Sequence, residues 1–308
     1  MSVWVSCRHR TRARDSKGIH VGLLRHRSGR RWRALGVAGA AALTLTGCSS
    51  DTLAQWSRAG LPEAASDRAV FIGDLWTGAW IASMVVGVFV WGLIGWAVVR
   101  YKRRKDAAAD HLPRQTRYNL PMELLYTLVP FLIIGVLFFY TVQAQNGVLA
   151  KSDAPDHTVN VIGQKWSWTF NYMEEANPAV GAVVHTKGTM DQLPDLYLPV
   201  GKSVRFNLVS ADVIHSFWIP DFYFKLDVIP GHPNAFEVTP TKVGEFTGRC
   251  AELCGTYHAA MLFNVHVVSE EEYLAHLTEL KTAGQVGEIL APTYPNTVPT
   301  VPATREHG

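Results

Sequence analysis

The chain has few cysteines and lacks the motif that attaches a c-type haem. Only four cysteines occur in 308 residues: Cys7, Cys48, Cys250 and Cys254. No C-x-x-C-H sequence is present, which excludes a covalently bound haem in this chain. Cys7 has no neighbouring ligand types, and we expect no role for it. At this length, with 48% apolar residues, the chain can form more than one structural unit.

Positive charge is scarce outside the first 33 residues. Residues 1–33 carry ten Lys and Arg against one acid, whereas residues 145–308 carry 10 bases and 18 acids. The net charge of +3 therefore reflects the N-terminal segment, and no nucleic-acid partner is expected. The acidic C-terminal part favours a basic partner if its acids cluster on one face, and otherwise forms a solvated acidic surface.

Residues 1–47 have the organisation of a basic leader and an export signal. The stretch RHRSGRRWR (25–33) is followed by the uncharged run 34–46, which is too short for a membrane span of about 20 residues. The ending LTGC resembles a bacterial lipobox, which implies lipidation of Cys48; the alternative is an ordinary signal peptide with a chance cysteine. Because residues 1–20 are longer and more basic than such a signal requires, we expect translation to start downstream, near Val21.

Two long uncharged runs predict two membrane-spanning helices. Residues 75–99 contain no charge and would form about 37 Å of helix. A second span is predicted over 123–144, where Pro130 is tolerated in a membrane bundle. The loop 100–118 carries seven bases and two acids, which predicts a cytoplasmic location. The segment 48–72 and both chain ends are then outside the cytoplasm, in a protein of the plasma membrane in contact with its lipids.

From His157 onward, short alternating runs rich in Val, Phe, Trp and Thr predict a β domain. These runs are separated by turn sequences such as Pro-Val-Gly and Ile-Pro-Gly, as in a small sandwich or barrel of about 110 residues. The predicted strands are HTVNVIGQ, KWSWTFNYM, KSVRFNLVS, NAFEVTP, GEFTGRC and LFNVHVVS. The domain is placed at 149–269, and residues 270–308 are predicted to be a helix, capped by Ser269, and a disordered tail.

The second pair of cysteines lies in a group of metal-ligand types. Cys250 and Cys254 are followed by His258 and Met261. A disulfide is one interpretation of two cysteines outside the cytoplasm. Thiolate, imidazole and thioether together are instead the ligand set of a copper electron-transfer site, whereas a closed zinc site would lack a fourth strong ligand. With two cysteines, both thiolates can bridge a pair of copper ions, each capped by one histidine.

The second histidine is expected on an earlier strand. His215 lies between two apolar runs in SADVIHSFWIP and is the best candidate. His185, His232 and His266 are weaker candidates, and His266 has the alternation of a strand residue that faces solvent.

The residues CAELCGTYHAAM (250–261) match in full the C-x-E-x-C-x3-H-x2-M signature of the dinuclear CuA centre of cytochrome c oxidase subunit II. The segments GQKWSW (163–168), DVIHSF (212–217) and KLDVIPG (225–231) follow the same family's order and approximate spacing. The chain resembles this family over roughly residues 70–270, in a lipidated form typical of actinobacteria. The resemblance implies an α+β membrane protein with a transmembrane hairpin (73–148) and a cupredoxin-like antiparallel β-sandwich or barrel.

The resemblance also implies a role for each matching residue. Copper would be bound by His215, Cys250, the backbone carbonyl of Glu252, Cys254, His258 and, weakly, Met261. The Glu252 side chain would bind a Mg or Mn ion shared with subunit I. Trp166 would be the point at which electrons enter, and Asp212 one of the acids facing the donor. Glu123 by position is either a helix-start residue or the mouth of a proton path; the resemblance implies the latter.

The implied activity is that of a proton-pumping cytochrome c oxidase. The chain would accept electrons from a c-type cytochrome, either soluble or the membrane-bound dihaem cytochrome of a bc complex. It would pass them to haem in subunit I, where oxygen is reduced; subunit III is a further expected partner. His232 stands where many relatives have Arg, which puts a contact with haem propionates in doubt.

Three other classes of protein share part of this pattern. A copper chaperone or thiol reductase uses C-x3-C with a distant His, but places it at a helix start early in the domain. A quinol oxidase subunit shares the hairpin and sandwich but lacks the copper ligands. Nitrous oxide reductase shares the copper motif but has no membrane hairpin.

Overall fold

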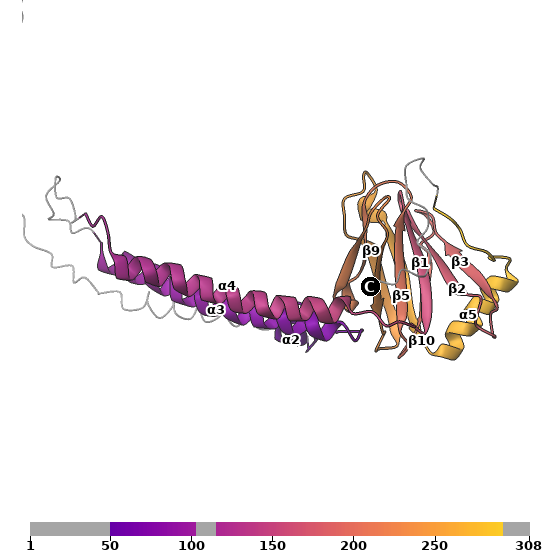
Figure 1. Cartoon of the computed structure of the whole chain (residues 1–308), viewed down its shortest axis with the longest axis horizontal. Helices are drawn as coiled ribbons and strands as arrows, with labels where there is room; N and C mark the ends of the chain where they lie inside the picture. The colour runs from indigo at the N-terminus through magenta and orange to yellow at the C-terminus, as the bar shows by residue number, and fades with distance from the viewer. Residues whose placement is uncertain (1–49, 103–114, 292–308) are drawn as a thin grey trace, which may run out of the picture. The chain divides into compact units, whose positions relative to one another are not determined.

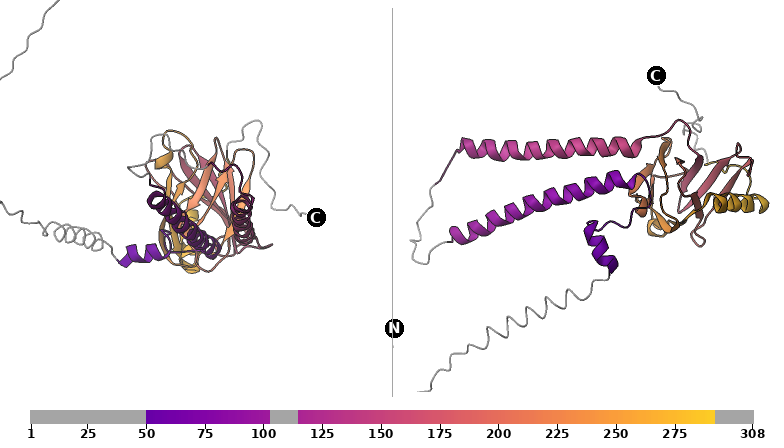
Figure 2. Two further views of the ribbon diagram at one scale, coloured as in Figure 1. Left: turned by 90° about the vertical axis from the view of Figure 1, so that its left-hand side faces the viewer. Right: turned by 90° about the horizontal axis from the view of Figure 1, so that it is seen from below.

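The computed structural model describes residues 50–102 and 115–291. A short helix, α2 (Ser50–Ser57), precedes two long helices, α3 (Ala69–Arg100) and α4 (Leu120–Leu149), which run in opposite directions (Figures 1 and 2). At about 1.5 Å per residue, α3 and α4 are roughly 48 and 45 Å long. The spans predicted at 75–99 and 123–144 lie within them. Both helices are apolar all round, and their most apolar windows are entirely unburied, so they need an apolar solvent.

One arginine joins the outer ends of the two long helices. Arg68, at the N-cap of α3, donates from Nη1 to the carbonyl of Gly147 (2.8 Å) and from Nη2 to that of Ala150 (3.1 Å). These are the free carbonyls at the end of α4, where a cation is favourable. The Phe71 ring packs on Gly147, where a Cβ would lie 2.7 Å from it. The ends of the hairpin are therefore closely packed.

The β domain consists of two five-stranded sheets packed face to face (Figure 1). One sheet has the order β3-β2-β1-β5-β8 and the other β4-β10-β9-β6-β7. Their bounds are β1 His157–Gln164, β2 Ser167–Glu174, β3 Ala182–Lys187, β4 Asp195–Pro199, β5 Val204–Ser210, β6 His215–Ile219, β7 Phe224–Val228, β8 Asn234–Val238, β9 Gly244–Cys250 and β10 Leu262–Val268. The predicted sandwich is confirmed, and β1, β9 and β10 closely match the predicted runs.

Six of the eight strand pairs are antiparallel, but β1 pairs with β5 and β10 with β4 in parallel. Parallel neighbours need a crossover connection. Here the chain leaves the first sheet after β3, forms β4 in the second, and returns as β5. The alternation of single strands does not reveal which strands become neighbours, so the sequence did not predict this feature.

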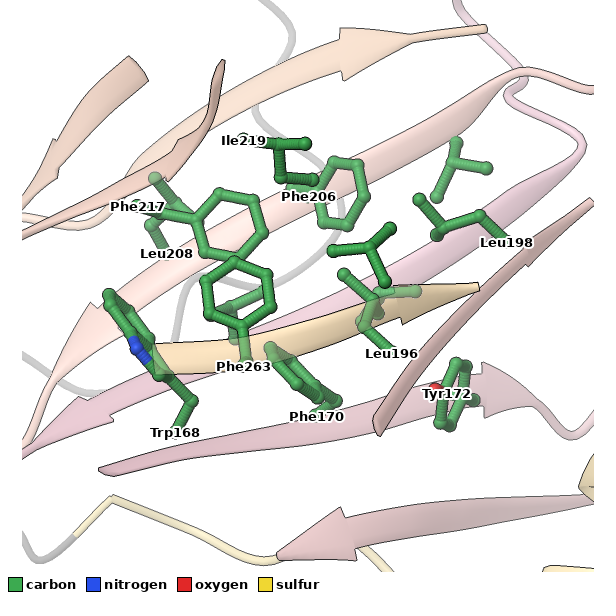
Figure 3. Packing of buried hydrophobic residues seen from close by; sticks show 14 of the residues in the cluster. Trp168, Phe170, Tyr172, Leu196, Leu198, Phe206, Leu208, Phe217, Ile219 and Phe263 are labelled. Carbon is green, nitrogen blue, oxygen red and sulfur yellow. The ribbon is translucent and has the colours of Figure 1, made fainter. Parts of the chain in front are cut away.

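Inward-facing aromatic side chains form the centre of the sandwich (Figure 3). Phe263 on β10 stacks on Phe217 of β6 with ring centroids 4.9 Å apart. Trp168 and Phe170 of β2 contact the same ring edge-on, at 5.6 and 5.4 Å. All four side chains are fully buried. This cluster connects the two sheets directly beneath the end of β9, where Cys250 lies.

The C-terminal helix and the segment after it cover the edge of the first sheet. α5 (Glu270–Thr282) begins with a capping box, in which Ser269 accepts from the Glu272 amide, as predicted. Beyond it the amide of His185 in β3 donates to the carbonyl of Gln285, and the amide of Gly287 donates to the carbonyl of Val183. The free edge of β3 is thus partly covered, which protects it from pairing with another chain.

Candidate metal centre

The predicted ligands come from two neighbouring strands and one loop. Cys250 is the last residue of β9, Met261 directly precedes β10, and the loop between them carries Cys254 and His258. The loop is closed at its base because the Cys250 amide donates to the carbonyl of Met261 (3.0 Å). His215 is the first residue of β6, which pairs with β9. Residues 35 positions apart in sequence are thereby brought to one end of the second sheet.

The side chains converge as the sequence predicts. The two sulfurs, Cys250 Sγ and Cys254 Sγ, lie 3.8 Å apart. His215 Nδ1 is 3.9 Å from Cys250 Sγ, and His258 Nδ1 is 3.6 Å from Cys254 Sγ. Met261 Sδ lies 3.7 Å from Cys254 Sγ. Each thiol therefore has its own imidazole, and the thioether is on the Cys254 side.

The sulfur separation matches shared metal ions. Two sulfurs bound to one ion at about 2.3 Å each can be at most about 4.6 Å apart. The observed 3.8 Å meets that limit, and it is far beyond the roughly 2.05 Å of a disulfide. A single tetrahedral zinc would leave the Met261 thioether and the nearby Glu252 carbonyl, 3.2 Å from Cys250 Sγ, without a function. Two bridging thiolates with one imidazole each fit a pair of copper ions better.

The two thiols differ in acidity. Burial alone would raise the pKa of Cys250, but hydrogen bonding from His215 and neighbouring backbone groups outweighs it and lowers this pKa to about 6. Burial and the adjacent Cys250 thiolate raise the pKa of Cys254 to about 12. Cys250 is therefore the more acidic of the two thiols, and binding of a cation would favour the loss of both protons.

Asp212 orients the first histidine. His215 Nε2 lies 2.8 Å from Asp212 Oδ1, while Nδ1 faces Cys250. A carboxylate on the second ring nitrogen fixes the tautomer of a metal-binding histidine. Asp212 is held in turn by the amides of Lys165 (2.8 Å) and Val213 (2.6 Å). The D-x-x-H spacing could have indicated this contact. The role of Asp212 in donor docking, which the family resemblance implies, stays a prediction.

Trp166 lies directly on the metal-binding loop. Its Nε1 donates to the carbonyl of Cys254 (3.2 Å), and its ring meets Tyr257 edge-on at 4.9 Å. Gly255 makes this possible, because its φ of +123° favours glycine and an added Cβ would lie 3.2 Å from the indole. Trp168, in contrast, is fully buried in the core and donates to the carbonyl of Met261 (3.4 Å).

The two predicted glutamates have local backbone contacts. Glu252 Oε1 accepts from the Leu253 amide (3.2 Å), and its side chain is exposed. Glu123 Oε1 accepts from the amide of Asn119 (3.1 Å), and the Asn119 side chain accepts from the amide of Met122. Together these bonds cap the N-terminus of α4, in the manner of a capping box. These contacts agree with the helix-start interpretation of Glu123, and its proton-path role remains a prediction.

The weaker histidine candidates have other partners. His185 Nδ1 contacts the Gly287 carbonyl (2.8 Å), and His266 Nε2 contacts Asp195 (3.0 Å). His232 lies in a turn bridged to Ile229. Within residues 50–102 and 115–291, the group of His, Cys and acidic ligand atoms able to hold a metal is His215, Cys250 and Cys254. Cys48 and most of the basic loop lie outside the described residues.

Fold and site together define a class: a β-sandwich with two thiols and two imidazoles placed where they could hold metal, attached to two helices long and apolar enough to span a membrane. The profile "Cytochrome C oxidase subunit II, periplasmic domain" matches residues 157–268, and its transmembrane-domain counterpart matches 54–144. The chain belongs to the cytochrome c oxidase subunit II family. It is a component of an oxidoreductase, and its β domain is extracytoplasmic.

Relatives cover most of the chain. A probable cytochrome c oxidase subunit 2 of Streptomyces avermitilis is 45% identical over 82% of this chain and 88% of its own length. Cytochrome c oxidase subunit 2 of Mycobacterium tuberculosis is 38% identical over 78% of this chain and 79% of its own. The crystal structure of the periplasmic domain of subunit II from Bradyrhizobium japonicum is 30% identical, with a TM-score of 0.37, over 44% of this chain and 98% of that domain.

Proposed function

We propose that this chain is the electron-accepting subunit of a proton-pumping cytochrome c oxidase, through a dinuclear copper centre. The observation that carries the proposal is the pair of thiols 3.8 Å apart, each with its own imidazole at 3.6–3.9 Å. A bound copper pair would supply one-electron redox chemistry shared over both ions. The chain's own residues determine where that pair is held and which groups surround it.

Cys250 and Cys254 would bridge the two ions as thiolates, with His215 and His258 as terminal ligands. Met261 and the Glu252 carbonyl would complete the set. Because β9, β10 and β6 are fixed by the aromatic core, the ligands need little reorganisation when the charge of the centre changes. Asp212 would keep Nδ1 of His215 directed at the metal.

Trp166 would connect the centre with its electron donor. Its indole N–H is bonded to the carbonyl of Cys254, so the ring reaches a ligand residue through one hydrogen bond. The donor would be a c-type cytochrome, in a soluble or membrane-bound dihaem form. The acidic surface of the domain, including Asp212, would attract a basic donor at a rate that falls with salt.

The remaining roles belong to the assembled oxidase. Subunits I and III would be partners, and oxygen would be reduced at subunit I. Glu252 would bind a Mg or Mn ion at the boundary with subunit I, and Glu123 would lie at the mouth of a proton path. Cys48 would carry a lipid in the mature protein.

Copper content and electron paramagnetic resonance test this proposal. The purified full chain, loaded with copper, should hold two copper ions and show one unpaired electron shared equally between them. Substitution of Cys254 by Ser should abolish the shared signal, whereas Thr256→Ser, at an exposed position of the same loop that is not a proposed ligand, should leave it unchanged. A spectrum of isolated single copper ions in the wild-type chain, or bound zinc alone, would contradict the proposal.

A further inference from the structure

Two unpaired cations lie beside one tryptophan on the outer face of the second sheet. Phe217 and Ile219 of β6 face the core, so Trp218 between them faces outward. Its direct partners across the two neighbouring strands are Lys225 on β7 and Arg249 on β9. Both are exposed. The three residues, here called the basic row, therefore form one line across the sheet, with the cations about 9.6 Å apart at the backbone.

The basic row has no acidic partner in the described parts of the chain. Neither Lys225 nor Arg249 makes an ion pair there, whereas Lys202, Arg205 and Lys242 each do. The guanidinium of Arg249 lies 5.6 Å from the Trp218 ring, within cation–π range, which holds it in place and leaves its in-plane N–H donors unused.

Two acids lie near the basic row without neutralising it. Asp227 is two residues along β7 from Lys225 and forms no ion pair with it. The pKa of Asp221 is raised by burial, and Lys242 and Arg249 offset this only in part. In a region of 10 bases and 18 acids, the basic row places two cations without ion pairs beside one tryptophan, where an anionic ligand could bind both.

The basic row borders a depression that reaches the metal-binding loop. The depression has a volume of about 510 Å³, and Cys250 and His258 line it together with the three residues of the row. A group that fills it would lie against two of the proposed copper ligands. A basic donor would be repelled from this face, while a carboxylate would find a guanidinium fork and an ammonium on one row.

We propose that the basic row docks a carboxylate-bearing segment of the oxidase subunit that receives the electron. This inference rests on the proposed function, because it assumes that an electron leaves the centre on the His258 side. Electrons would then enter at Trp166, beside Asp212, and leave across a face of opposite charge. The charge difference would keep the donor and the acceptor on separate faces.

Charge reversal in the full chain, expressed with its oxidase partners, tests this docking site. The chain is purified by a tag, and the haem recovered per chain reports the partner subunit. The double variant K225E/R249E should lower the recovered haem at least about tenfold, because like charges across an interface cost several kcal/mol. R249K keeps the positive charge but loses the guanidinium fork, so its haem recovery should lie between that of wild type and that of the double variant. The matched control is K187E, at an exposed lysine with no ion pair among the described residues, on the other sheet; it should recover as much haem as wild type.

Copper resonance on the same samples separates the possible failures. An intact copper signal with normal haem recovery in the double variant overturns the docking proposal alone. A missing copper signal in the wild-type chain overturns the proposed function, whatever the haem recovery. If the K225E/R249E protein is not produced, the double variant K225Q/R249M, which removes both charges, is tested in its place. It should also lower the haem recovered per chain. If wild-type assembly depends on added anionic phospholipid, and the double variant's does not, the ligand is a lipid headgroup and the proposal is wrong.

Discussion

Gly248→Ala should destabilise the β domain and disturb the metal centre. Gly248 on β9 lies directly opposite Phe263 on β10. A Cβ built at Gly248 would be 2.0 Å from Cε2 and Cζ of the Phe263 ring, which is far inside van der Waals contact. The ring has little freedom to move, because Phe217 stacks on it and Trp168 and Phe170 meet its edges (Figure 3).

The expected magnitude follows from two opposing effects. Overpacking of a well-packed core costs about 1–3 kcal/mol. Replacing a strand glycine by alanine returns roughly 0.5–1 kcal/mol, because the unfolded chain becomes less flexible. The net loss should be about 1–2 kcal/mol. Gly248 lies two residues from Cys250, and Phe263 lies two residues from Met261. The displacement of the Phe263 ring by the new methyl group should therefore also disturb the copper site.

Thermal unfolding followed by near-ultraviolet circular dichroism measures this loss. For a domain of this size, 1–2 kcal/mol should lower the melting temperature by roughly 3–10 °C. Thr247→Ser, at the neighbouring exposed position of β9, should change it little. In the double variant G248A/F263L the smaller Leu side chain makes room for the new methyl group. Its loss of stability should therefore be less than the sum of the losses in the two single variants. Unchanged melting in Gly248→Ala, or strictly additive losses, would refute the clash.

Two further predictions concern contacts around the metal site and α5. Asp212→Asn should lower copper affinity about 10- to 100-fold, measured by competition with a chelator, because His215 Nε2 loses the carboxylate that orients it; equal affinity would show that Asp212 does not position the ring. Burial lowers the pKa of His276, so the unfolded chain binds more protons and stability should fall as pH drops below about 6.5. His276→Gln should flatten this decline in melting temperature; an identical pH dependence in the two proteins would argue against it.

Strands with clear alternation were the predictable part of the fold. β1, β9 and β10 match their predicted runs because each has one face in the core and carries that pattern in its own residues. β3, β4 and β7 were missed because they are short edge strands with less regular patterns. His215 was expected on a strand, and it is the first residue of β6. The run HSFWI does not show simple alternation because β6 is apolar on both faces: Phe217 faces the core, while Trp218 lies outward in the basic row.

The site was predictable to the level of ligand types. Four of its ligands lie within twelve residues, so spacing alone indicated a common centre. The distant His215 was identified as the best of several histidines and is the one that the structure brings to the cysteines. The position of Trp166 against the carbonyl of Cys254 depends on how distant strands are arranged, which no local pattern records.

The sequence by itself determined the membrane hairpin, the sandwich and the copper-type ligand set, because apolar run length, strand alternation and ligand spacing are local properties of the chain. Only the tertiary structure decided which thiol pairs with which imidazole, that the two sulfurs stand 3.8 Å apart, and that Lys225 and Arg249 flank Trp218. The reason is physical: these relations arise from strand order and register, which the whole core sets through packing between residues far apart in the chain.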